Sequence, residues 1–153
     1  MITHWDGAAF AGAKLAALVD GRILTYRRDD KPGIPWPGCI DLPGGGREGD
    51  ESPAMCACRE LAEEFGLYLP EQRIWWARPF PAMDRRKGSL GGTGWFLAAT
   101  ITPAEAAAIR FGTEGHSPQL LGIAAFLAAA DAIAPLQHRL QLVLDSAVSN
   151  AVS

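Results

Sequence analysis

The chain has 153 residues, which is enough for one domain with a substantial hydrophobic core and too few for two. Its 14 Lys and Arg side chains and 17 Asp and Glu side chains give a net charge of −3, and 48% of its residues are hydrophobic. This balance excludes an intrinsically disordered chain and gives no sign of a nucleic-acid polymer as a partner.

The sequence also lacks the marks of a membrane or secreted protein. The longest apolar run, residues 120–130, is far shorter than the ~20 residues that a transmembrane helix needs, and no charged and apolar leader opens the chain. The three cysteines form no C-x-x-C pair, so neither a disulfide framework nor a zinc site is expected. We therefore expect a cytoplasmic protein with a single domain over residues 1–153 and no membrane contact.

The first predicted elements are two strands joined by a tight turn. Ala13–Val19 and Arg22–Arg27 flank Asp20-Gly21, a dipeptide typical of a two-residue β-hairpin. The elements expected next are a loop over 29–37, a short strand over 39–41 and the glycine run LPGGG at 42–46.

A helix is predicted after the glycine run. Ser52-Pro53 supplies an N-cap followed by a first-turn proline, which is the usual start of a helix. The helix should end near Phe65 because Gly66 follows, and glycine readily adopts the left-handed conformation that closes a helix.

The second half of the chain mixes strands and helices. Strands are predicted over 73–80 and 95–101, with a basic, glycine-rich loop between them. Thr102-Pro103 and Ser117-Pro118 repeat the cap-and-proline pattern and predict two more helices, and a last helix follows Pro135. This mixture predicts an α/β fold with a mixed β-sheet.

The segment RELAEEFGL at 59–67 places Glu60, Glu63 and Glu64 within one turn of the predicted helix. Carboxylates three and four residues apart repel one another, and more strongly as their surroundings become dry. A hard divalent cation relieves this repulsion, and Mg²⁺ is commonly held by carboxylates together with substrate phosphates. A solvated helix face would carry the same E-x-x-E-E pattern, so the neighbouring residues decide between the two interpretations.

The residues around this segment complete a longer motif. Gly45 precedes Glu51 by six positions, Glu51 precedes Arg59 by eight, and Gly66-Leu67 closes the string. Every fixed position of the Nudix box, G-x5-E-x7-R-E-U-x-E-E-x-G-U with U an aliphatic residue, is therefore present. The chain resembles the Nudix hydrolases, and the resemblance implies their α/β/α sandwich over nearly the whole chain.

The resemblance also implies an activity, which is hydrolysis of a nucleoside diphosphate linked to another group, with Mg²⁺ or Mn²⁺ as the cofactor. Carried over by position, the implied metal ligands are Glu60, Glu63, Glu64 and the Gly45 carbonyl. Arg59 would orient a box glutamate through a charge-assisted hydrogen bond, and Glu51 would lie beside the metal ligands. In this scheme the metal polarises phosphorus and a carboxylate takes the proton of the attacking water.

The general base stays open between a box glutamate and Glu114, a carboxylate downstream of the box that would act as base or as an additional metal ligand. Glu114 is flanked by Gly112 and Gly115, so an ordinary turn residue is an equal alternative. His116, two residues farther on, is either a phosphate contact or an ordinary surface group.

Two further residues are candidates for substrate contacts. Arg27 and Arg28 end a predicted strand and point to opposite sides of the sheet, and Arg27 is our choice for a phosphate contact, with a merely solvated arginine as the alternative. Trp36 lies in the loop before the glycine run, where it would either stack on a nucleobase or pack under a proline-rich loop.

The small chain favours a nucleoside triphosphate as the substrate, cleaved by pyrophosphohydrolysis. Pro81 stands fifteen residues after Gly66, a position that is associated with ADP-ribose hydrolases in this family, so ADP-ribose or another nucleotide sugar is the alternative. A non-catalytic nucleotide-binding module would be expected to lose box carboxylates, and this chain retains all of them. Many relatives pair as homodimers, but no predicted element here presents an exposed apolar face that argues for one.

Overall fold

A mixed seven-stranded sheet forms the centre of the fold in the computed structural model, which describes residues 1–83, 92–110 and 118–152. Its first hairpin is the predicted one, because β1 (Gly12–Val19) and β2 (Arg22–Arg27) pair in antiparallel fashion around Asp20-Gly21. Both turn residues have a positive φ, 47° at Asp20 and 73° at Gly21, as a tight hairpin turn of this kind requires.

The remaining strands extend this hairpin on both sides. β1 pairs in parallel with β6 (Thr93–Thr100), and β6 pairs in antiparallel fashion with β5 (Ile74–Pro81). β3 (Ile40–Asp41) and β7 (Gln119–Gly122) both pair with β2, and β4 (Gly44–Gly46) pairs with the first residues of β1. One parallel pair among antiparallel ones makes the sheet mixed, as the sequence predicts.

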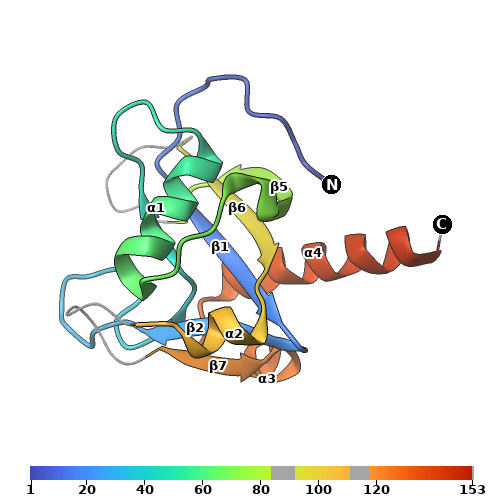
Figure 1. Ribbon diagram of the computed structural model, residues 1–153. Coiled ribbons are helices and arrows are strands. Elements are labelled where there is room, and N and C mark those ends of the chain that lie inside the picture. Colours follow the sequence, from blue (N-terminus) through green and yellow to red (C-terminus); the bar gives the residue numbers. More distant parts are fainter. Residues whose placement is uncertain (84–91, 111–117, 153) are drawn as a thin grey trace.

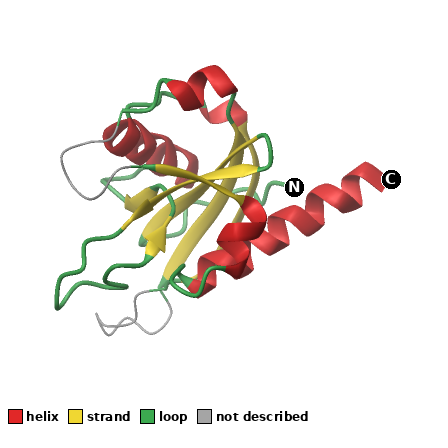
Figure 2. Ribbon diagram, turned by 90° about the horizontal axis from the view of Figure 1, so that it is seen from below, coloured by secondary structure: helices red, strands yellow, loops and turns green. Residues whose placement is uncertain are grey.

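Helices cover both faces of this sheet, as Figure 1 and Figure 2 show. The helix α1 (Pro53–Phe65) lies on one face, and α3 (Ile123–Ala128) and α4 (Ala134–Val152) lie on the other. Two short elements, η1 (Glu71–Arg73) and α2 (Pro103–Ala107), precede β5 and follow β6. The predicted α/β/α sandwich is therefore confirmed. None of the helices in the described ranges is both long and apolar enough to cross a bilayer.

The boundaries of α1 follow from the residues that were expected to set them. The Ser52 hydroxyl accepts a hydrogen bond from the Met55 N–H at 3.1 Å, and Pro53 occupies the first turn. At the other end Gly66 adopts φ 65° and donates its N–H to the Ala62 carbonyl. This helix carries the acidic residues of the predicted site, so the positions of its caps set the helical turn on which these residues lie.

Alternation along β1 divides the core into two clusters. Ala13, Leu15 and Ala17 point toward α1, where they pack with Leu61 and Phe65. The side chains between them point to the other face, where Trp76, Phe96, Phe126 and Leu136 fill the space under α3 and α4. Lys14 belongs to this second face, so the sheet carries a lysine close to an apolar core.

The structure contradicts one predicted helix. The Ser117-Pro118 pattern predicts a helix directly after the proline, but residues 119–122 form the strand β7, and α3 starts only at Ile123. β7 pairs with β2 along four residues, with Leu24 opposite Leu120. The prediction was wrong because pairing with an open edge of β2 is a long-range contact that a local capping pattern does not reveal.

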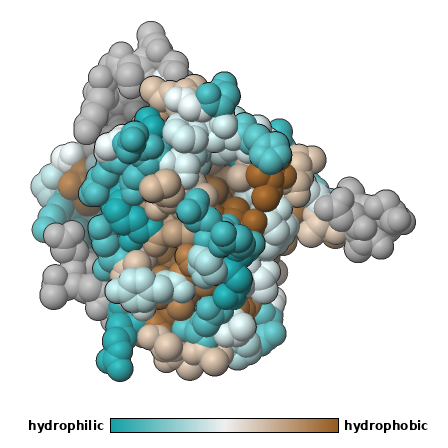
Figure 3. All heavy atoms as spheres, turned by 45° about the horizontal axis from the view of Figure 1, so that its top comes forward, coloured by the Kyte–Doolittle hydropathy of each residue, from teal (hydrophilic) through white to brown (hydrophobic). Residues whose placement is uncertain are grey.

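Hydrophobic side chains on the surface are few and scattered. Figure 3 shows one face of the molecule, on which hydrophilic residues predominate and hydrophobic ones appear between them. The large hydrophobic residues that are exposed in the described ranges are Met1, Ile2, Met55, Tyr68 and Val148. Met1 and Ile2 are consecutive residues of the N-terminal segment, whereas Met55 lies in α1, Tyr68 follows α1 and Val148 lies in α4. The homodimer stays a prediction.

A capping ion pair on α2 gives the first testable prediction. Glu105 accepts from the Thr102 N–H at 2.8 Å and from Arg73 at 2.6 Å, and the Arg73 hydrogen bond is the main cause that lowers the pKa of Glu105 to about 2. This stabilisation is complete above the ordinary pKa of 4.5 and disappears as the pH falls to about 2. We expect Glu105→Gln to lower the melting temperature by roughly 2–4 °C at pH 7.

The matching measurement is thermal unfolding of both proteins between pH 7 and pH 2. The difference should vanish toward pH 2, where the wild-type carboxyl is protonated as well. Glu71→Gln, at an exposed residue of η1, is the control and should change little. A difference between the wild type and Glu105→Gln that does not depend on pH would contradict the assignment.

Candidate functional site

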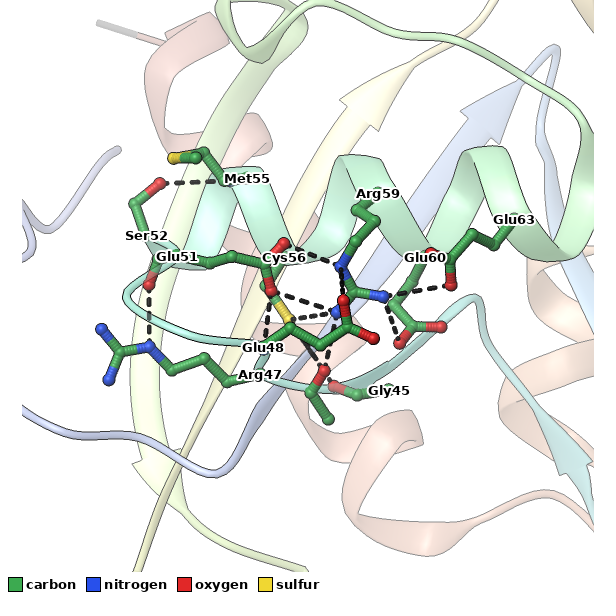
Figure 4. Close-up of polar contacts among 11 residues, drawn as sticks. Gly45, Arg47, Glu48, Glu51, Ser52, Met55, Cys56, Arg59, Glu60 and Glu63 are labelled. Atoms are coloured by element: carbon green, nitrogen blue, oxygen red, sulfur yellow. Dashed lines mark hydrogen bonds and ion pairs between the residues drawn. The ribbon is translucent and has the colours of Figure 1, made fainter.

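The Arg59 guanidinium is the centre of the polar contacts on α1, as Figure 4 shows. Its Nε donates to Glu51 at 2.7 Å, its Nη1 donates to Glu60 and to Glu63 at 3.1 Å each, and its Nη2 donates to the Gly46 carbonyl at 2.8 Å. The hydrogen bond to Glu51 is the largest of the effects that raise the pKa of Arg59 above its usual value. Arg59 therefore offsets the negative charge of three box glutamates at once.

Glu60 and Glu64 lie against the backbone of β4. The Gly44 N–H donates to Oε1 of Glu64 at 2.9 Å, and Oε1 of Glu60 lies 2.6 Å from the point that a β-carbon on Gly45 would occupy. A side chain at this position would collide with the Glu60 carboxylate. The first glycine of the box therefore leaves room for the Glu60 carboxylate against β4, because a β-carbon at Gly45 would displace this flexible side chain.

Both carboxyls are harder to ionise here than in water. Burial is the largest effect on Glu64 and raises its pKa to about 7, although the Gly44 amide and the Lys14 ammonium oppose it. Burial also raises the pKa of Glu60, where the Arg59 guanidinium opposes the shift and repulsion from Glu63 adds to it. A cation between these side chains would stabilise their charged forms, so the electrostatics of the site favour cation binding.

The carboxylates do not form a closed metal cage in this arrangement. Within residues 1–83, 92–110 and 118–152, no group of three His, Cys, Asp or Glu side chains is placed to hold a metal ion. Glu63 is 56% exposed and turned toward Arg59, whereas Glu64 is turned toward β4. The donor set still fits Mg²⁺ or Mn²⁺, because such ions are usually held by one or two carboxylates, with water and substrate phosphates completing the coordination.

The carbonyl groups of β4 have different partners. The Gly45 carbonyl contacts the Cys56 thiol at 3.7 Å, while the Gly44 carbonyl accepts from the Lys14 ammonium at 3.4 Å. Burial raises the pKa of Cys56 to about 11, so this thiol stays protonated and can donate. The Gly45 carbonyl as a metal ligand stays a prediction, whereas the Gly44 carbonyl already faces the Lys14 ammonium.

A pocket of about 400 Å³ opens beside β4, and this volume lies in the range of small-molecule sites. The residues that line it include Lys14, Tyr26, Arg28, Trp36, Met83, Arg139 and the three glycines of β4. Glu60 and Glu64 do not line the pocket themselves, but both contact β4, whose three glycines do. The pocket and the acidic face of α1 therefore both border β4.

Asp41 is the central acceptor of a buried polar network that lines the pocket. Its side chain is 1% exposed, and its Oδ2 accepts from Lys14 at 3.0 Å, from Tyr26 at 2.9 Å and from Arg28 at 3.0 Å. Burial alone would raise the pKa of Asp41, but attraction to Lys14 and these hydrogen bonds outweigh burial and leave the pKa below its ordinary value. Lys14 also donates to the Leu42 and Gly44 carbonyls and so ties the network to β4.

The structure separates the two arginines at the end of β2. Arg27 donates to Asp131 at 2.9 Å and to the Gly38 carbonyl at 2.8 Å, and it is not among the residues that line the pocket. Arg28 lines the pocket instead, with its Nε on the Pro35 carbonyl. Sequence reasoning placed the two on opposite sides of the sheet but had no means of knowing which side would carry the pocket.

Trp36 lines the pocket as well, so its candidacy for stacking is compatible with the geometry. Its φ is 51°, an uncommon conformation for a residue with a side chain, and such strain is often found in binding loops. Glu114 and His116 lie outside the described residues, and their roles stay predictions. A lysine inside the apolar strand GAKLAALV is the signal that would have pointed to the Asp41 network.

Comparisons with known proteins give matches in sequence and in fold. The NUDIX domain family model matches residues 12–137. An RNA pyrophosphohydrolase of Gluconobacter oxydans is 35% identical over 77 residues, which are 48% of this chain and 42% of that protein. The chain thus spans less than half the length of this curated relative.

Two solved structures share the fold. A Nudix hydrolase from M. smegmatis, RenU, has a TM-score of 0.65 at 18% identity, with 90% of this chain and 87% of that chain covered. A bifunctional NMN adenylyltransferase/ADP ribose pyrophosphatase from Francisella tularensis, complexed with AMP and a Mn ion, has a TM-score of 0.53 at 20% identity, with 82% and 36% covered. The family model spans most of the chain and includes the whole box, and the chain therefore belongs to the Nudix hydrolase family.

Proposed function

We propose that this protein is a metal-dependent pyrophosphohydrolase that acts on a nucleoside triphosphate. The observation that carries the proposal is the position of Glu60 and Glu64, which lie against β4 at the side of a pocket of about 400 Å³. A nucleoside in the pocket would have its phosphates beside these carboxylates. The family assignment and the RNA pyrophosphohydrolase relative support cleavage of a phosphoanhydride bond.

Each residue of the site has its own role in the proposed reaction. Glu60, Glu63 and Glu64 would hold Mg²⁺ or Mn²⁺, with the Gly45 carbonyl as a further ligand. When bound, the cation neutralises the phosphates and polarises phosphorus for attack by water. A carboxylate of the site accepts the proton of that water.

Arg59 keeps the carboxylates in place before a substrate arrives. Its guanidinium binds Glu60 and Glu63 while it is itself fixed by Glu51 and by the Gly46 carbonyl. Glu51 is held in turn by the Glu48 N–H at 2.8 Å. This network restricts the side-chain rotamers of the metal-site glutamates, and preorganisation of this kind lowers the entropy cost of binding.

ADP-ribose or another nucleotide sugar is the alternative substrate. Pro81, the residue on which that alternative rests, is the last residue of β5 and lies next to the pocket residue Ala82. A non-catalytic nucleotide-binding module is the second alternative. In both alternatives a nucleotide still binds in the pocket. A nucleotide sugar would give a different product, and a non-catalytic module would give no product.

The test is a panel of nucleotides incubated with and without Mg²⁺, in which pyrophosphate, phosphate and nucleoside monophosphate are measured separately. We expect a nucleoside triphosphate to yield monophosphate and pyrophosphate only when Mg²⁺ or Mn²⁺ is present. Faster release of AMP from ADP-ribose would instead favour the alternative substrate. Binding of nucleotides without any product would support the non-catalytic module and overturn the proposal.

Arg59→Lys is expected to reduce turnover about 10- to 100-fold, since residues that orient metal ligands commonly have effects of this size. A lysine keeps the charge but lacks the planar fork that reaches Glu51, Glu60 and Glu63 together. Turnover should be measured against Mg²⁺ concentration, and the variant should need more Mg²⁺ for half-maximal rate. Arg22→Lys, at an exposed arginine of β2, is the matched control. Equal activity of the two variants would contradict a role for the guanidinium.

A further inference from the structure

Arg139 of α4 is a buried cation with an incomplete set of partners. It is 7% exposed, its Nη2 donates to the Pro81 carbonyl at 2.8 Å, and its guanidinium lies 4.6 Å from the centre of the Phe80 ring. No carboxylate of the described ranges lies within ion-pair distance of it. Burial lowers the pKa of Arg139, which agrees with the lack of a compensating anion. A guanidinium has five N–H donors, so several of those of Arg139 have no acceptor among the described residues.

Arg139 lines the same pocket as the three glycines of β4. Besides the polar residues of the Asp41 network, the lining includes the apolar Met83 and Ile133 and the half-buried Trp36. Flat apolar walls suit the faces of a nucleobase, and an isolated donor group at such a wall suits its polar edge. A phosphate would require several donors together, whereas the other two cations of the lining, Lys14 and Arg28, already donate to the Asp41 carboxylate.

We propose that Arg139 recognises the acceptor edge of a purine that carries an oxygen at C6, so that guanine and hypoxanthine are preferred to adenine. The inference rests on the proposed function and names the substrate class within it. O6 and N7 of such a base are two neighbouring acceptors that match two guanidinium N–H groups. Adenine has an amino donor in place of O6, and this donor would face the cation. This preference also argues against ADP-ribose as the substrate, because ADP-ribose is an adenine nucleotide.

The sharpest test compares GTP, ITP and ATP, because ITP shares O6 and N7 with GTP but lacks its amino group at C2. We expect kcat/KM for GTP and ITP to exceed that for ATP by roughly 5- to 150-fold, mainly through KM. Arg139→Met should bring the three nucleotides to within about threefold of one another, since it removes the donors and keeps an apolar side chain of similar length. A uniform loss for all three would assign Arg139 to a phosphate and overturn the proposal, as would a wild type that prefers ATP.

Arg78→Met is the matched control, because the Arg78 guanidinium also lies over Phe80, at 5.7 Å, but does not line the pocket. The Arg78→Met variant should keep the base preference of the wild type. Should Arg139→Met fail to fold, Arg139→Gln presents one donor and one acceptor, which match N7 and the amino group of adenine, and it should shift the preference toward ATP. A glutamine variant that keeps the full preference for GTP and ITP would contradict the proposal.

Binding of GMP, IMP and AMP, measured by calorimetry, separates this inference from the proposed function. Tighter binding of GMP and IMP than of AMP, lost in Arg139→Met, supports the role of Arg139 even when no triphosphate is hydrolysed. Hydrolysis of all three triphosphates without base preference, together with equal binding of the monophosphates, overturns the role of Arg139 and leaves the proposed function standing.

Discussion

Glu64→Gln is expected to reduce hydrolysis by at least ~10²-fold while the protein stays folded. The amide oxygen can still accept the Gly44 N–H, so the packing of α1 on β4 is kept. The variant would lose the negative charge that we propose holds the cation beside the phosphates. The measurement is kcat at saturating nucleotide across a range of Mg²⁺ concentrations.

The stability of the same variant should change in the opposite direction. In the absence of metal the Glu64 carboxyl keeps its proton up to about pH 7 in the folded state, because burial disfavours its charged form, against an ordinary value of 4.5. Ionisation therefore costs stability as the pH rises from 4.5 to about 7, and the loss persists above it. Metal-free Glu64→Gln avoids this cost and should melt at or above the wild-type temperature at pH 8.

Addition of Mg²⁺ should separate the two proteins further. The wild type should gain thermal stability as Mg²⁺ binds to the folded state, whereas Glu64→Gln should gain little. Glu71→Gln, an exposed glutamate of η1, should behave like the wild type in both measurements. Retained hydrolysis in Glu64→Gln, or an equal response of both proteins to Mg²⁺, would remove Glu64 from the metal site.

Asp41→Asn should be strongly destabilising, with a loss of about 3–5 kcal/mol in the free energy of unfolding. The Asp41 carboxylate is 1% exposed and accepts from Lys14, Tyr26 and Arg28. Without its charge, the Lys14 and Arg28 cations are left in a largely buried place with no anion between them. Urea unfolding monitored by tryptophan fluorescence measures the loss, and the pocket should lose nucleotide affinity as well.

The pH dependence of this loss has a definite sign. The pKa of Asp41 is lower in the folded protein than its ordinary value of 3.8, so its stabilisation is complete above pH 4 or so and is lost as the pH falls through the depressed pKa. The difference between the wild type and Asp41→Asn should therefore be constant from pH 5 to pH 8 and shrink only in stronger acid.

A double variant shows whether unpaired charge is the cause. Asp41→Leu combined with Lys14→Met removes an acid and a base together, and it should recover part of the stability that Asp41→Leu alone loses. If the stability that the double variant loses exceeds the sum of the losses of the two single variants, hydrogen bonds to the β4 segment outweigh the charge effect. Either way the coupling energy between Lys14 and Asp41 follows from the four proteins.

The amino-acid sequence by itself determined the features that depend on nearby residues. Asp20-Gly21 identifies the first hairpin, and Ser52-Pro53 and Gly66 set the ends of α1 to the residue. The box also places Glu60, Glu63 and Glu64 on one turn, because a helix brings residues three and four apart together. These predictions hold because turn and cap energies are local and do not depend on the rest of the chain.

Tertiary structure alone decided which of these side chains share a site. Arg28 lines the pocket and Arg27 pairs with Asp131, which is 104 positions away in the chain, and Arg139 reaches the pocket from α4. β7 forms because β2 offers an open edge, although the local pattern at Ser117-Pro118 favours a helix. Contacts of this kind depend on strand register and on how α4 packs against the sheet, and neither is encoded within a short window of sequence.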